Sequence, residues 1–597
     1  MNNSPFKGYS KVNEAEEIAF RKKTRRRLLV IALSTILLVG IVGAIVGTVI
    51  HKSNNNNNKN NGSSSSTNGT NNWSPNSIIK AICTETNYPD TCFSSLSSFS
   101  TNSSSSSNNK FDLPEELFKY SLQVALNELS TISSLPDNFI NRTNVNDTRL
   151  IVALKDCKTL FGDAIDELND SIASAHHDSW LNNIDDIRIW LNAVLTDLET
   201  CLDGLDEMSS NNNVLLLSEM RTCLQNSTMY TSNSLAIVTN IVGLVDKFSV
   251  IPMQHRKLLS SDGGDYPDWV NERDMRRLLD QNASAVMKAD LTVAQDGTGT
   301  HTTIQDAVNA VTKKKQTRTV IYVKAGVYFE NVIVAKEHWN IVMYGDGSTN
   351  TTVSGSLNYA DGASTFKCGT FQVNGKGFVA RDIGFKNTAG PEKHQAVALR
   401  SSADLSVFYR CAFDAYQDTL YTHKNRQFYR DCFITGTVDF IFGNAAVVFQ
   451  NCSIQPRQPL PNQYNTITAQ GKIDKDNATG ISIHRCTITA NGQVTARTYL
   501  GRPWKNFSTT VIMGSMIDGM VDPAGWIAWS QNTEPPTTIY YAEYNNSGPG
   551  AALDDRVKWA GYRPAMSDEK AHTFTVDPFF KGSRWIPHAI VPFDTSL

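Results

Sequence analysis

Hydrophobic and polar residues follow three different patterns along the 597 residues of the chain. Residues 28–50 contain no charged residue and are long and apolar enough for a transmembrane helix. Within 76–245, apolar residues recur at three- and four-residue spacing, as in 151–175 and 185–205, which predicts amphipathic helices. After residue 286 the pattern changes to short runs of β-branched and aromatic residues separated by glycine and asparagine, which predicts strands.

The helical pattern predicts an all-α antiparallel bundle over residues 76–245. Proline is scarce there, and short polar segments separate the predicted helices. This part of the sequence has neither a cluster of acids and bases nor a metal-ligand spacing. We therefore expect a packed bundle without a catalytic role of its own.

The predicted strands repeat along residues 286–597. Cys411, Cys432, Cys452 and Cys486 occupy the same place in four similar runs, at steps of 21, 20 and 34 residues. No helical pattern separates these runs, which argues against alternating strands and helices. Irregular repeats of this kind predict an all-β right-handed parallel β-helix, in which the step of 34 is a coil with a loop insertion. A β-sandwich is the alternative, but it would not require the repeated position of the cysteines.

Polar segments frame these two domains. A basic run at 21–27 precedes the apolar span, so the positive-inside rule places residues 1–27 in the cytosol. A signal-anchor at 28–50 fits the long polar leader better than the alternative, a cleaved signal peptide. Residues 51–75, rich in asparagine and serine, predict a flexible tether, and residues 246–285 predict a polar linker.

The linker contains two basic-dileucine tetrads. The first is Arg256-Lys257-Leu-Leu, and the second is Arg276-Arg277-Leu-Leu. Exposed interdomain segments are preferred sites of proteolysis, so both tetrads are candidate processing sites.

Composition narrows the class of function. The net charge is −3 and no basic stripe alternates with aromatic residues, so we do not expect a nucleic-acid partner. In an exported chain the ten cysteines are expected to form disulfides or buried thiols instead of a metal site. Several Asn-X-Ser/Thr sequons are typical of an exported glycoprotein. We expect no metal and no cofactor.

Asp439 is a charged residue within an otherwise apolar run, where a carboxylate is costly unless it has a partner. It lies seven residues after Cys432, and Asp418 lies seven residues after Cys411. If the coils stack, the two carboxylates are about one strand spacing apart, or about 4.8 Å. They could not both ionise freely, so the pKa of one should rise. Such a pair can supply an acid together with a base or a nucleophile.

Three further polar residues belong to the candidate site. Arg502, in the turn Leu-Gly-Arg-Pro-Trp-Lys, can keep one aspartate ionised, with Trp504 as an apolar wall. Gln417 and Gln395 carry amide N–H groups that can bind a developing oxyanion. The sequence has no G-x-S-x-G motif, so a serine esterase of the usual kind is excluded.

Two histidines are interpreted as structural. His394 and His423 have no partner at a spacing that would indicate a metal site or a catalytic triad. The sequence gives neither of them a place in the proposed chemistry.

The motifs that contain these residues resemble those of plant pectin methylesterases (pectinesterases). In order along residues 286–597 they are QDGTGTHTTIQDAV, NTAGPEKHQAVALR, AYQDTLY, GTVDFIFGNA and YLGRPW. The helical part resembles a pectinesterase-inhibitor domain in CTETNYPDTC, ALKDC and DLETCLDGL. The chain is therefore similar to precursors in which an inhibitor-like pro-region precedes a carboxylic ester hydrolase with the β-helix fold.

The resemblance implies a role for each candidate residue. Asp439 is the nucleophile that attacks the methyl-ester carbonyl of a galacturonosyl residue, and Asp418 is first the proton donor and then the base. Gln417, with Gln395, stabilises the tetrahedral intermediate, and Arg502 orients Asp439. Positions that match the family's substrate groove are Thr365, Phe366, Gln395, Tyr421, Phe442, Arg502, Trp504 and Trp529.

The resemblance also implies three disulfides. In the inhibitor-like part they are Cys83–Cys92 and Cys157–Cys201, which leaves Cys223 free. In the enzyme part the implied pair is Cys432–Cys452, although Cys411–Cys432 is also possible from the sequence.

The expected partners follow from the same resemblance. They are methyl-esterified pectin, the chain's own pro-region, separate inhibitor proteins, a subtilisin-like protease acting at a basic tetrad, and a membrane before cleavage. We expect the protein to pass through the secretory pathway to the cell wall, and the pro-region to restrain activity until it is removed.

Two alternatives of different kinds are weighed against this interpretation. A polygalacturonase or pectate lyase of the same fold would need acidic pairs for glycosidic cleavage, or a calcium site with a basic residue. A binding or inhibitory protein with an inactive enzyme domain would not require intact acid, nucleophile, amide and guanidinium groups. The candidate residues present in the sequence favour the esterase.

Overall fold

In the computed structural model, helices form the N-terminal part of the described chain and strands form most of the C-terminal part. The residues that the structure describes are 75–102, 113–142, 147–177, 179–208, 214–248, 288–530, 533–589 and 591–597. The predicted membrane span at 28–50 and the two basic tetrads lie outside them. Within the described part of the chain, no helix combines the length and the apolar character needed to cross a bilayer.

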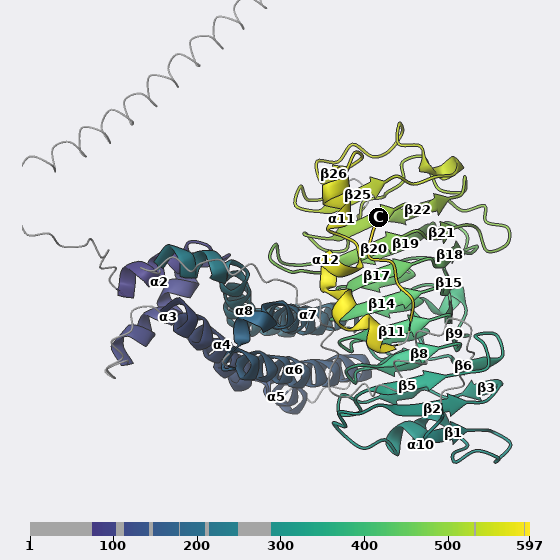
Figure 1. Ribbon diagram of the computed structural model, residues 1–597, viewed down its shortest axis with the longest axis horizontal. Coiled ribbons are helices and arrows are strands. Elements are labelled where there is room, and N and C mark those ends of the chain that lie inside the picture. Colours follow the sequence, from purple (N-terminus) through teal and green to yellow (C-terminus); the bar gives the residue numbers. More distant parts are fainter. Residues whose placement is uncertain are drawn as a thin grey trace, which may run out of the picture. The chain divides into compact units, whose positions relative to one another are not determined.

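The N-terminal part is all-α, as the spacing of its apolar residues predicts (Figure 1). Its helices are α2 (Pro75–Cys83), α3 (Pro89–Asn102), α4 (Leu113–Ile132), α5 (Leu135–Arg142), α6 (Thr148–Ala175), η1 (Trp180–Asn183), α7 (Ile184–Met208) and α8 (Val214–Phe248). Helix α6 packs mainly on α7, and α4 packs on α8. Leu150, Leu154, Cys157 and Phe161 of α6 are buried at four-, three- and four-residue steps. Burial of this stripe holds the bundle together.

Two disulfides connect neighbouring helices of the bundle. Cys83–Cys92 joins α2 to α3, and Cys157–Cys201 joins α6 to α7. Both pairings are the ones that the resemblance implies, and Cys223 is a free thiol as expected.

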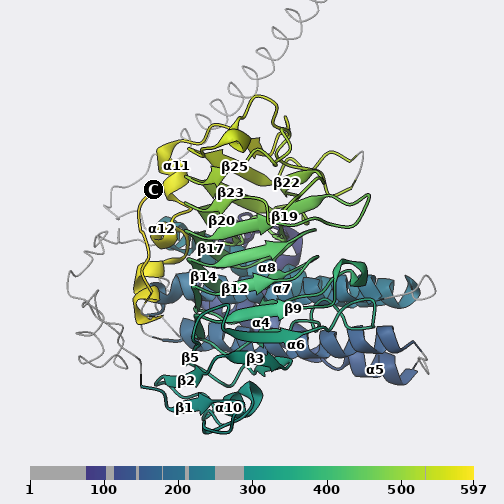
Figure 2. The same ribbon diagram turned by 90° about the vertical axis from the view of Figure 1, so that its right-hand side faces the viewer.

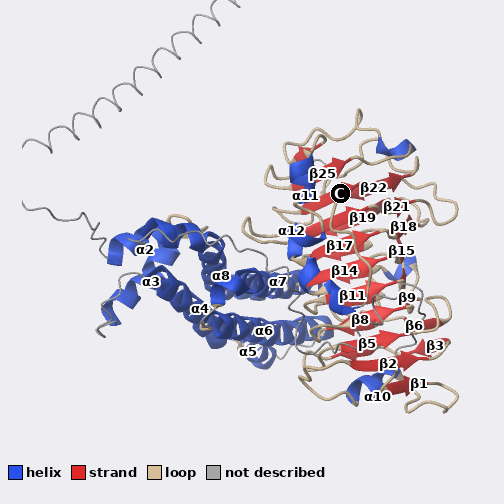
Figure 3. Cartoon of the chain, in the orientation of Figure 1, coloured by secondary structure: helices blue, strands red, loops and turns tan. Residues whose placement is uncertain are grey.

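The C-terminal part is a parallel β-helix made of three sheets, and every strand pairing in it is parallel (Figure 3). The 11-stranded sheet contains β1 (Leu291–Val293), β2 (Thr319–Val323), β5 (Ile341–Tyr344), β8 (Val379–Arg381), β11 (Ser406–Tyr409), β14 (Arg426–Arg430), β17 (Ala446–Gln450), β20 (Gly480–His484), β23 (Thr509–Met513), β25 (Tyr540–Tyr544) and β26 (Tyr562–Arg563).

The other two sheets are shorter. The 8-stranded sheet contains β3 (Gly326–Phe329), β6 (Thr351–Gly355), β9 (Gly384–Asn387), β12 (Ala412–Asp414), β15 (Phe433–Gly436), β18 (Ser453–Pro456), β21 (Thr487–Ile488) and β24 (Met516–Ile517). The 7-stranded sheet contains β4 (Val332–Val334), β7 (Phe371–Val373), β10 (Leu399–Ser401), β13 (Leu420–Thr422), β16 (Ile441–Gly443), β19 (Asn465–Gln470) and β22 (Thr498–Gly501).

Each complete coil of the β-helix, from the coil of β2, β3 and β4 to that of β20, β21 and β22, adds one strand to each sheet, so that strands stack along the axis (Figure 2). Ala412 pairs with Phe433, which pairs with Ser453, and Ser453 pairs with Thr487. The four cysteines that precede these residues therefore occupy one position in successive coils, as the repeat predicts. Residues 457–464 and 471–479, between strands, account for the longer third step.

The implied disulfide Cys432–Cys452 is wrong, because both residues are thiols in the structure. The Cys432 thiol donates to the carbonyl of Arg430 at 3.3 Å, and the Cys452 thiol donates to that of Gln450 at 3.5 Å. Each thiol thus has the backbone carbonyl two residues before it as a hydrogen-bond partner. The alternative partner, Cys411, is also a thiol.

Short helices occur between and after the strands. They are α10 (Ile304–Asn309), η3 (Pro391–Lys393), η4 (Pro549–Ala551), α11 (Asp568–His572), α12 (Val576–Phe580), η5 (Gly582–Arg584) and η6 (Ile586–Ala589). Val576 and Phe580 of α12 pack against Val407, Phe428 and Val448 on the outer face of the 11-stranded sheet. The C-terminal segment thereby covers apolar surface that this sheet would otherwise expose.

Aromatic side chains stack inside the β-helix. The ring of Phe408 lies 4.7 Å from that of Tyr429, which lies 4.7 Å from that of Phe449. All three residues are 0% exposed and belong to the interior cluster. Because these rings come from consecutive coils, they tie neighbouring coils together.

We predict that Phe408→Ala lowers the free energy of unfolding by about 3–5 kcal/mol, because it leaves a cavity in this stack. Thermal or denaturant unfolding, followed by a signal from the β-helix, measures the change. Phe329→Ala is the matched control, since Phe329 is 81% exposed and should matter little. Equal losses in the two variants would contradict the role of the stack.

Candidate active site

The two predicted aspartates lie in adjacent coils. Leu420 at the start of β13 pairs with Ile441 at the start of β16, so Asp418 and Asp439 occupy the same position two residues earlier. The N–H group of Asp418 donates to the carbonyl of Val438 at 3.0 Å. Both aspartates have a positive φ, 64° and 50°, in equivalent turns. Since neighbouring strands are about 4.8 Å apart, this register brings the two side chains together as the sequence predicts.

Arg502 holds Asp439 by two parallel ionic hydrogen bonds. Its Nε donates to Oδ1 at 2.8 Å, and its Nη2 donates to Oδ2 at 2.6 Å. Thr466 also donates its hydroxyl to Oδ1 at 2.6 Å and accepts the N–H of Asp439 at 2.8 Å. Asp439 is only 6% exposed, so these partners offset the cost of burying its charge.

Asp418 has a different electrostatic environment. Burial raises the pKa of its carboxyl group well above the usual value, and the nearby carboxylates of Asp439 and Glu207 raise it further. Arg502 opposes this shift but remains directed at Asp439. Asp418 therefore favours its protonated form beside a carboxylate that is paired with a cation.

A strip of aromatic side chains lies beside the aspartates. Tyr421 stacks on Phe442 with ring centroids 4.2 Å apart, and Trp504 lies 6.3 Å from both Phe442 and Trp529. The guanidinium of Arg502 lies 4.2 Å from the centroid of the Trp529 ring. Flat apolar faces of this kind suit the faces of sugar rings.

The two predicted amides lie in loops that precede strands β10 and β13 of adjacent coils. Gln417 directly precedes Asp418. The backbone carbonyl of Gln417 accepts the N–H of Ala396 at 3.2 Å. Gln395 directly precedes Ala396. The backbone carbonyl of Gln395 accepts the N–H of Tyr359 at 2.9 Å. Both glutamines are half-buried. Their backbones are fixed close to the aspartates.

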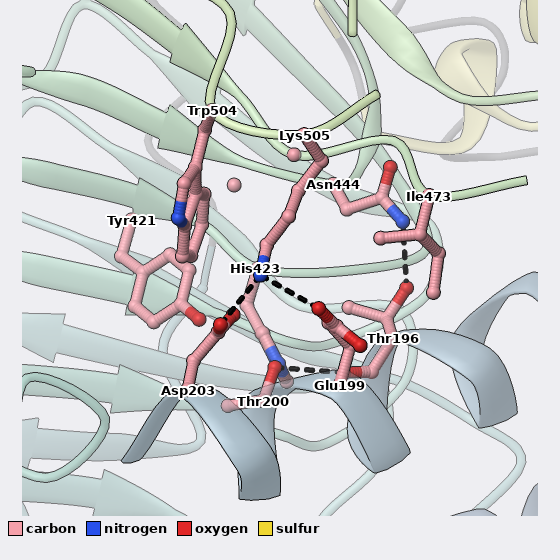
Figure 4. Close-up of a pocket in the computed structure, with 12 residues that line it drawn as sticks. Thr196, Glu199, Thr200, Asp203, Tyr421, His423, Asn444, Ile473, Trp504 and Lys505 are labelled. Carbon is pink, nitrogen blue, oxygen red and sulfur yellow. Dashed lines mark hydrogen bonds and ion pairs between the residues drawn. The ribbon is translucent and has the colours of Figure 1, made fainter. Parts of the chain in front are cut away.

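Helix α7 of the bundle presents a row of carboxylates to this site. Glu199, Asp203 and Glu207 are four residues apart and so lie on one face of the helix. Glu199 and Asp203 bind the amino group of Lys505 at 2.6 and 2.5 Å, as Figure 4 shows. Glu207 accepts hydrogen bonds from the hydroxyl and the N–H of Thr365. The helix thus contacts two residues beside the aromatic strip.

The aromatic strip is buried against the same bundle. Phe366, Tyr421 and Phe442 are 5%, 3% and 4% exposed, and they belong to the hydrophobic cluster that contains the core of the bundle. Trp504 packs against this cluster, whereas Trp529 is 39% exposed. A narrow pocket, lined in part by Tyr421 and Trp504, lies next to α7 (Figure 4).

His423 is one of the residues that line this pocket, and it lies within hydrogen-bond distance of Thr200 of α7 at 3.0 Å and Ser402 at 2.9 Å. Burial lowers the pKa of its imidazole well below the usual value, so that the ring is neutral. These contacts agree with the structural interpretation from the sequence. Within the described part of the chain, no group of three or more His, Cys, Asp or Glu side chains could hold a metal ion.

Sequence reasoning missed Thr466, Lys505 and the carboxylates of α7. Thr466 occupies the position of Asp439 in the next coil, because Ile441 pairs with Thr468. The loop insertion in that coil hid this equivalence. The spacing of Glu199, Asp203 and Glu207 was visible in the sequence, but an acidic helix face usually faces solvent.

Comparison with known proteins agrees with this architecture. Residues 290–583 match the family model "Pectinesterase", and residues 77–237 match "Plant invertase/pectin methylesterase inhibitor". The chain is 51% identical over 598 residues to "Pectinesterase 3" of Phaseolus vulgaris, which covers 99% of each chain. It is 47% identical over 596 residues to "Probable pectinesterase/pectinesterase inhibitor 46" of Arabidopsis thaliana, covering 99% of this chain and 100% of that protein.

A solved structure shares the enzyme domain. The pectin methylesterase from carrot is 48% identical, with a TM-score of 0.51, and the match covers 53% of this chain and 100% of that one. The two full-length relatives include the helical part as well as the β-helix. The chain therefore belongs to the pectinesterase family and is a pectinesterase that carries an N-terminal inhibitor-like domain.

Proposed function

We propose that this pectinesterase demethylates cell-wall homogalacturonan through an aspartyl acyl-enzyme. The observation that carries the proposal is the difference between the two stacked carboxyl groups. Asp439 is bound by Arg502 and Thr466, whereas burial and negative neighbours raise the pKa of Asp418. One residue is thus suited to nucleophilic attack and the other to proton donation.

In the first half of the reaction, Asp439 attacks the carbonyl carbon of the methyl ester. The negative charge that develops on the carbonyl oxygen is stabilised by the side-chain amides of Gln417 and Gln395. Asp418 gives its proton to the departing methoxide, so methanol leaves and an anhydride links Asp439 to the sugar carbonyl. Arg502 keeps the nucleophile oriented by its two hydrogen bonds.

In the second half, Asp418 acts as a base. Its carboxylate takes a proton from a water molecule while the water oxygen attacks the carbonyl of the acyl-enzyme. The bond to Asp439 then breaks, which releases the galacturonic acid group and restores Asp439 as a carboxylate and Asp418 as an acid. The sum of both halves is ester plus water giving acid plus methanol.

We also propose that the inhibitor-like domain restrains the enzyme until it is removed. The contacts that support this proposal are those of α7 with Thr365 and Lys505, together with burial of Tyr421 and Phe442 against the bundle. A polymer cannot bind a strip that the bundle already covers. Separate inhibitor proteins could use the same surface of the enzyme.

Maturation follows from the proposed restraint. We propose that a subtilisin-like protease cuts at Arg256-Lys257 or Arg276-Arg277, after a signal-anchor at 28–50 has brought the chain into the secretory pathway. The glycosylated enzyme would then act in the cell wall. The sequence motifs support this route.

We predict that Asp439→Asn lowers kcat for methanol release by about 10³-fold or more, because it removes the nucleophile. Asp418→Asn should lower kcat by about 10²–10⁴-fold, the usual range for a general acid. Methanol and reducing ends are measured together. The matched control is Asp414→Asn, which removes a carboxylate that pairs with Arg457 at 2.7 Å. Full activity of Asp439→Asn, or chain scission without methanol, would refute the mechanism.

We predict that the uncleaved chain releases methanol at least about tenfold more slowly than the same chain cut in the linker and separated from its bundle. The physical reason is competition between the bundle and pectin for one surface. Methanol release is compared before and after cleavage. A chain with Arg256, Lys257, Arg276 and Arg277 replaced by alanine provides the uncleaved reference. Equal activity of cut and uncut chains would rule out restraint.

We predict that the two pieces of the cut chain separate more readily as the pH rises. Burial raises the pKa of Asp203 to about 6 and that of Asp197 to about 8. A carboxyl group whose pKa is raised in the complex binds a proton on association, so affinity is highest at low pH. The affinity of the two pieces should fall between about pH 4 and 6 as Asp203 loses its proton. It should fall further, up to about pH 8, as Asp197 loses its proton.

Size-exclusion chromatography of the cut chain at a series of pH values measures this separation. Asp203→Asn should weaken the pH dependence of the affinity below pH 6 and leave the dependence above pH 6 unchanged. A complex that becomes tighter with rising pH would contradict the assignment.

A further inference from the structure

Lys505 lies at the edge of the aromatic strip, directly after Trp504. Its amino group lies 5.1 Å from the centroid of the Trp504 ring. The backbone around it is fixed by Ser508, whose hydroxyl accepts the N–H of Lys505 at 3.0 Å and donates to its carbonyl at 2.8 Å. Contacts within the β-helix therefore fix the backbone of Lys505 and place its side chain beside the Trp504 ring.

Two other cations near the strip, Arg502 and Arg400, have partners within the β-helix. Arg502 is bound to Asp439. Arg400 donates to Gln372 at 2.8 Å and to Asn374 at 3.2 Å, both from the preceding coil. These guanidinium groups are already engaged and are poorly placed to take up a charge from the substrate.

The charged partners of Lys505 come from the bundle. Its ion pairs in the described structure are with Glu199 and Asp203, both on α7. When the bundle leaves, the amino group faces the groove without these carboxylates. It is then a cation beside a surface that binds a polymer of galacturonic acid and its methyl ester.

We propose that Lys505 binds the free carboxylate of an already de-esterified galacturonosyl residue near the residue whose ester reacts. Before cleavage, Glu199 and Asp203 occupy this position with carboxylates of the same kind. The inference rests on the proposed function, in which the aromatic strip binds the polymer.

The chemistry of the contact supports this assignment. An ammonium group has three donors and can hold two carboxylates at once, as it does with those of α7. A methyl ester has no charge and would form a much weaker contact with the same group. Lys505 should therefore favour polymer regions that already contain free acid, so that demethylation continues next to earlier products.

The test compares two substrates. The full chain is expressed, cut in the linker, and recovered in the form that releases methanol. Lys505→Gln should raise KM for half-esterified pectin about tenfold, while KM for fully esterified pectin changes less than about twofold and kcat stays the same. Lys505→Arg, which keeps the charge, should retain most of the preference.

Lys336→Gln is the matched control. Lys336 also pairs with the bundle, through Asp163 and Asp166, but it follows β4, at the opposite end of the 7-stranded sheet from β22, which precedes Lys505. It should leave both KM values unchanged. Equal changes in KM for both substrates with Lys505→Gln, or no change with either, would overturn the proposal.

A binding measurement keeps the proposal testable if turnover is lost. Fully de-esterified pectate, titrated by calorimetry, should bind about tenfold more weakly to Lys505→Gln than to the unchanged enzyme. Equal affinity would overturn the proposal. Neither readout depends on which aspartate is the nucleophile, so failure of this subsite leaves the acyl-enzyme mechanism standing, and Asp439→Asn tests that mechanism separately.

Discussion

The parallel pairing of successive coils is the constraint on which the enzyme domain depends. Each complete coil adds one strand to each of three sheets, and backbone hydrogen bonds fix its register against the coil before it. Equivalent side chains therefore repeat at about 4.8 Å along the axis. The same rule stacks Phe408 on Tyr429 in the interior and Tyr421 on Phe442 outside it. It also brings Asp418 next to Asp439, where repulsion would be costly without a cation.

Arg502 resolves this repulsion because it comes from a later coil. It lies 63 residues after Asp439 in the chain and binds that carboxylate through two hydrogen bonds. Within the described residues Asp418 has no such ion pair, so burial and neighbouring negative charge favour its neutral form. Two chemically identical residues thus differ because their surroundings differ. The apolar surroundings that make each charge expensive also enlarge this difference.

The bundle meets the enzyme with both apolar and acidic groups. Its core cluster continues onto Phe366, Tyr421 and Phe442, while α7 places carboxylates on Thr365 and Lys505. A chain of uronic acids would also bind to aromatic faces and to hydrogen-bond donors such as Thr365 and Lys505. Ion pairs of this kind are weak when exposed and stronger when desolvated, so their contribution depends on the apolar contacts that exclude water around them.

The sequence by itself determined the fold class and most of the site. Apolar spacing gave the helices, and the repeated cysteine position gave the stacked coils and hence the pairing of Asp418 with Asp439. The sequence did not decide the state of Cys432 and Cys452, because position in the repeat says which residues are neighbours but not whether a covalent bond joins them. Only the tertiary structure placed Thr466 on Asp439 and the carboxylates of α7 on Lys505. Those contacts join distant segments across a loop insertion or between two domains, where local periodicity carries no information about distance.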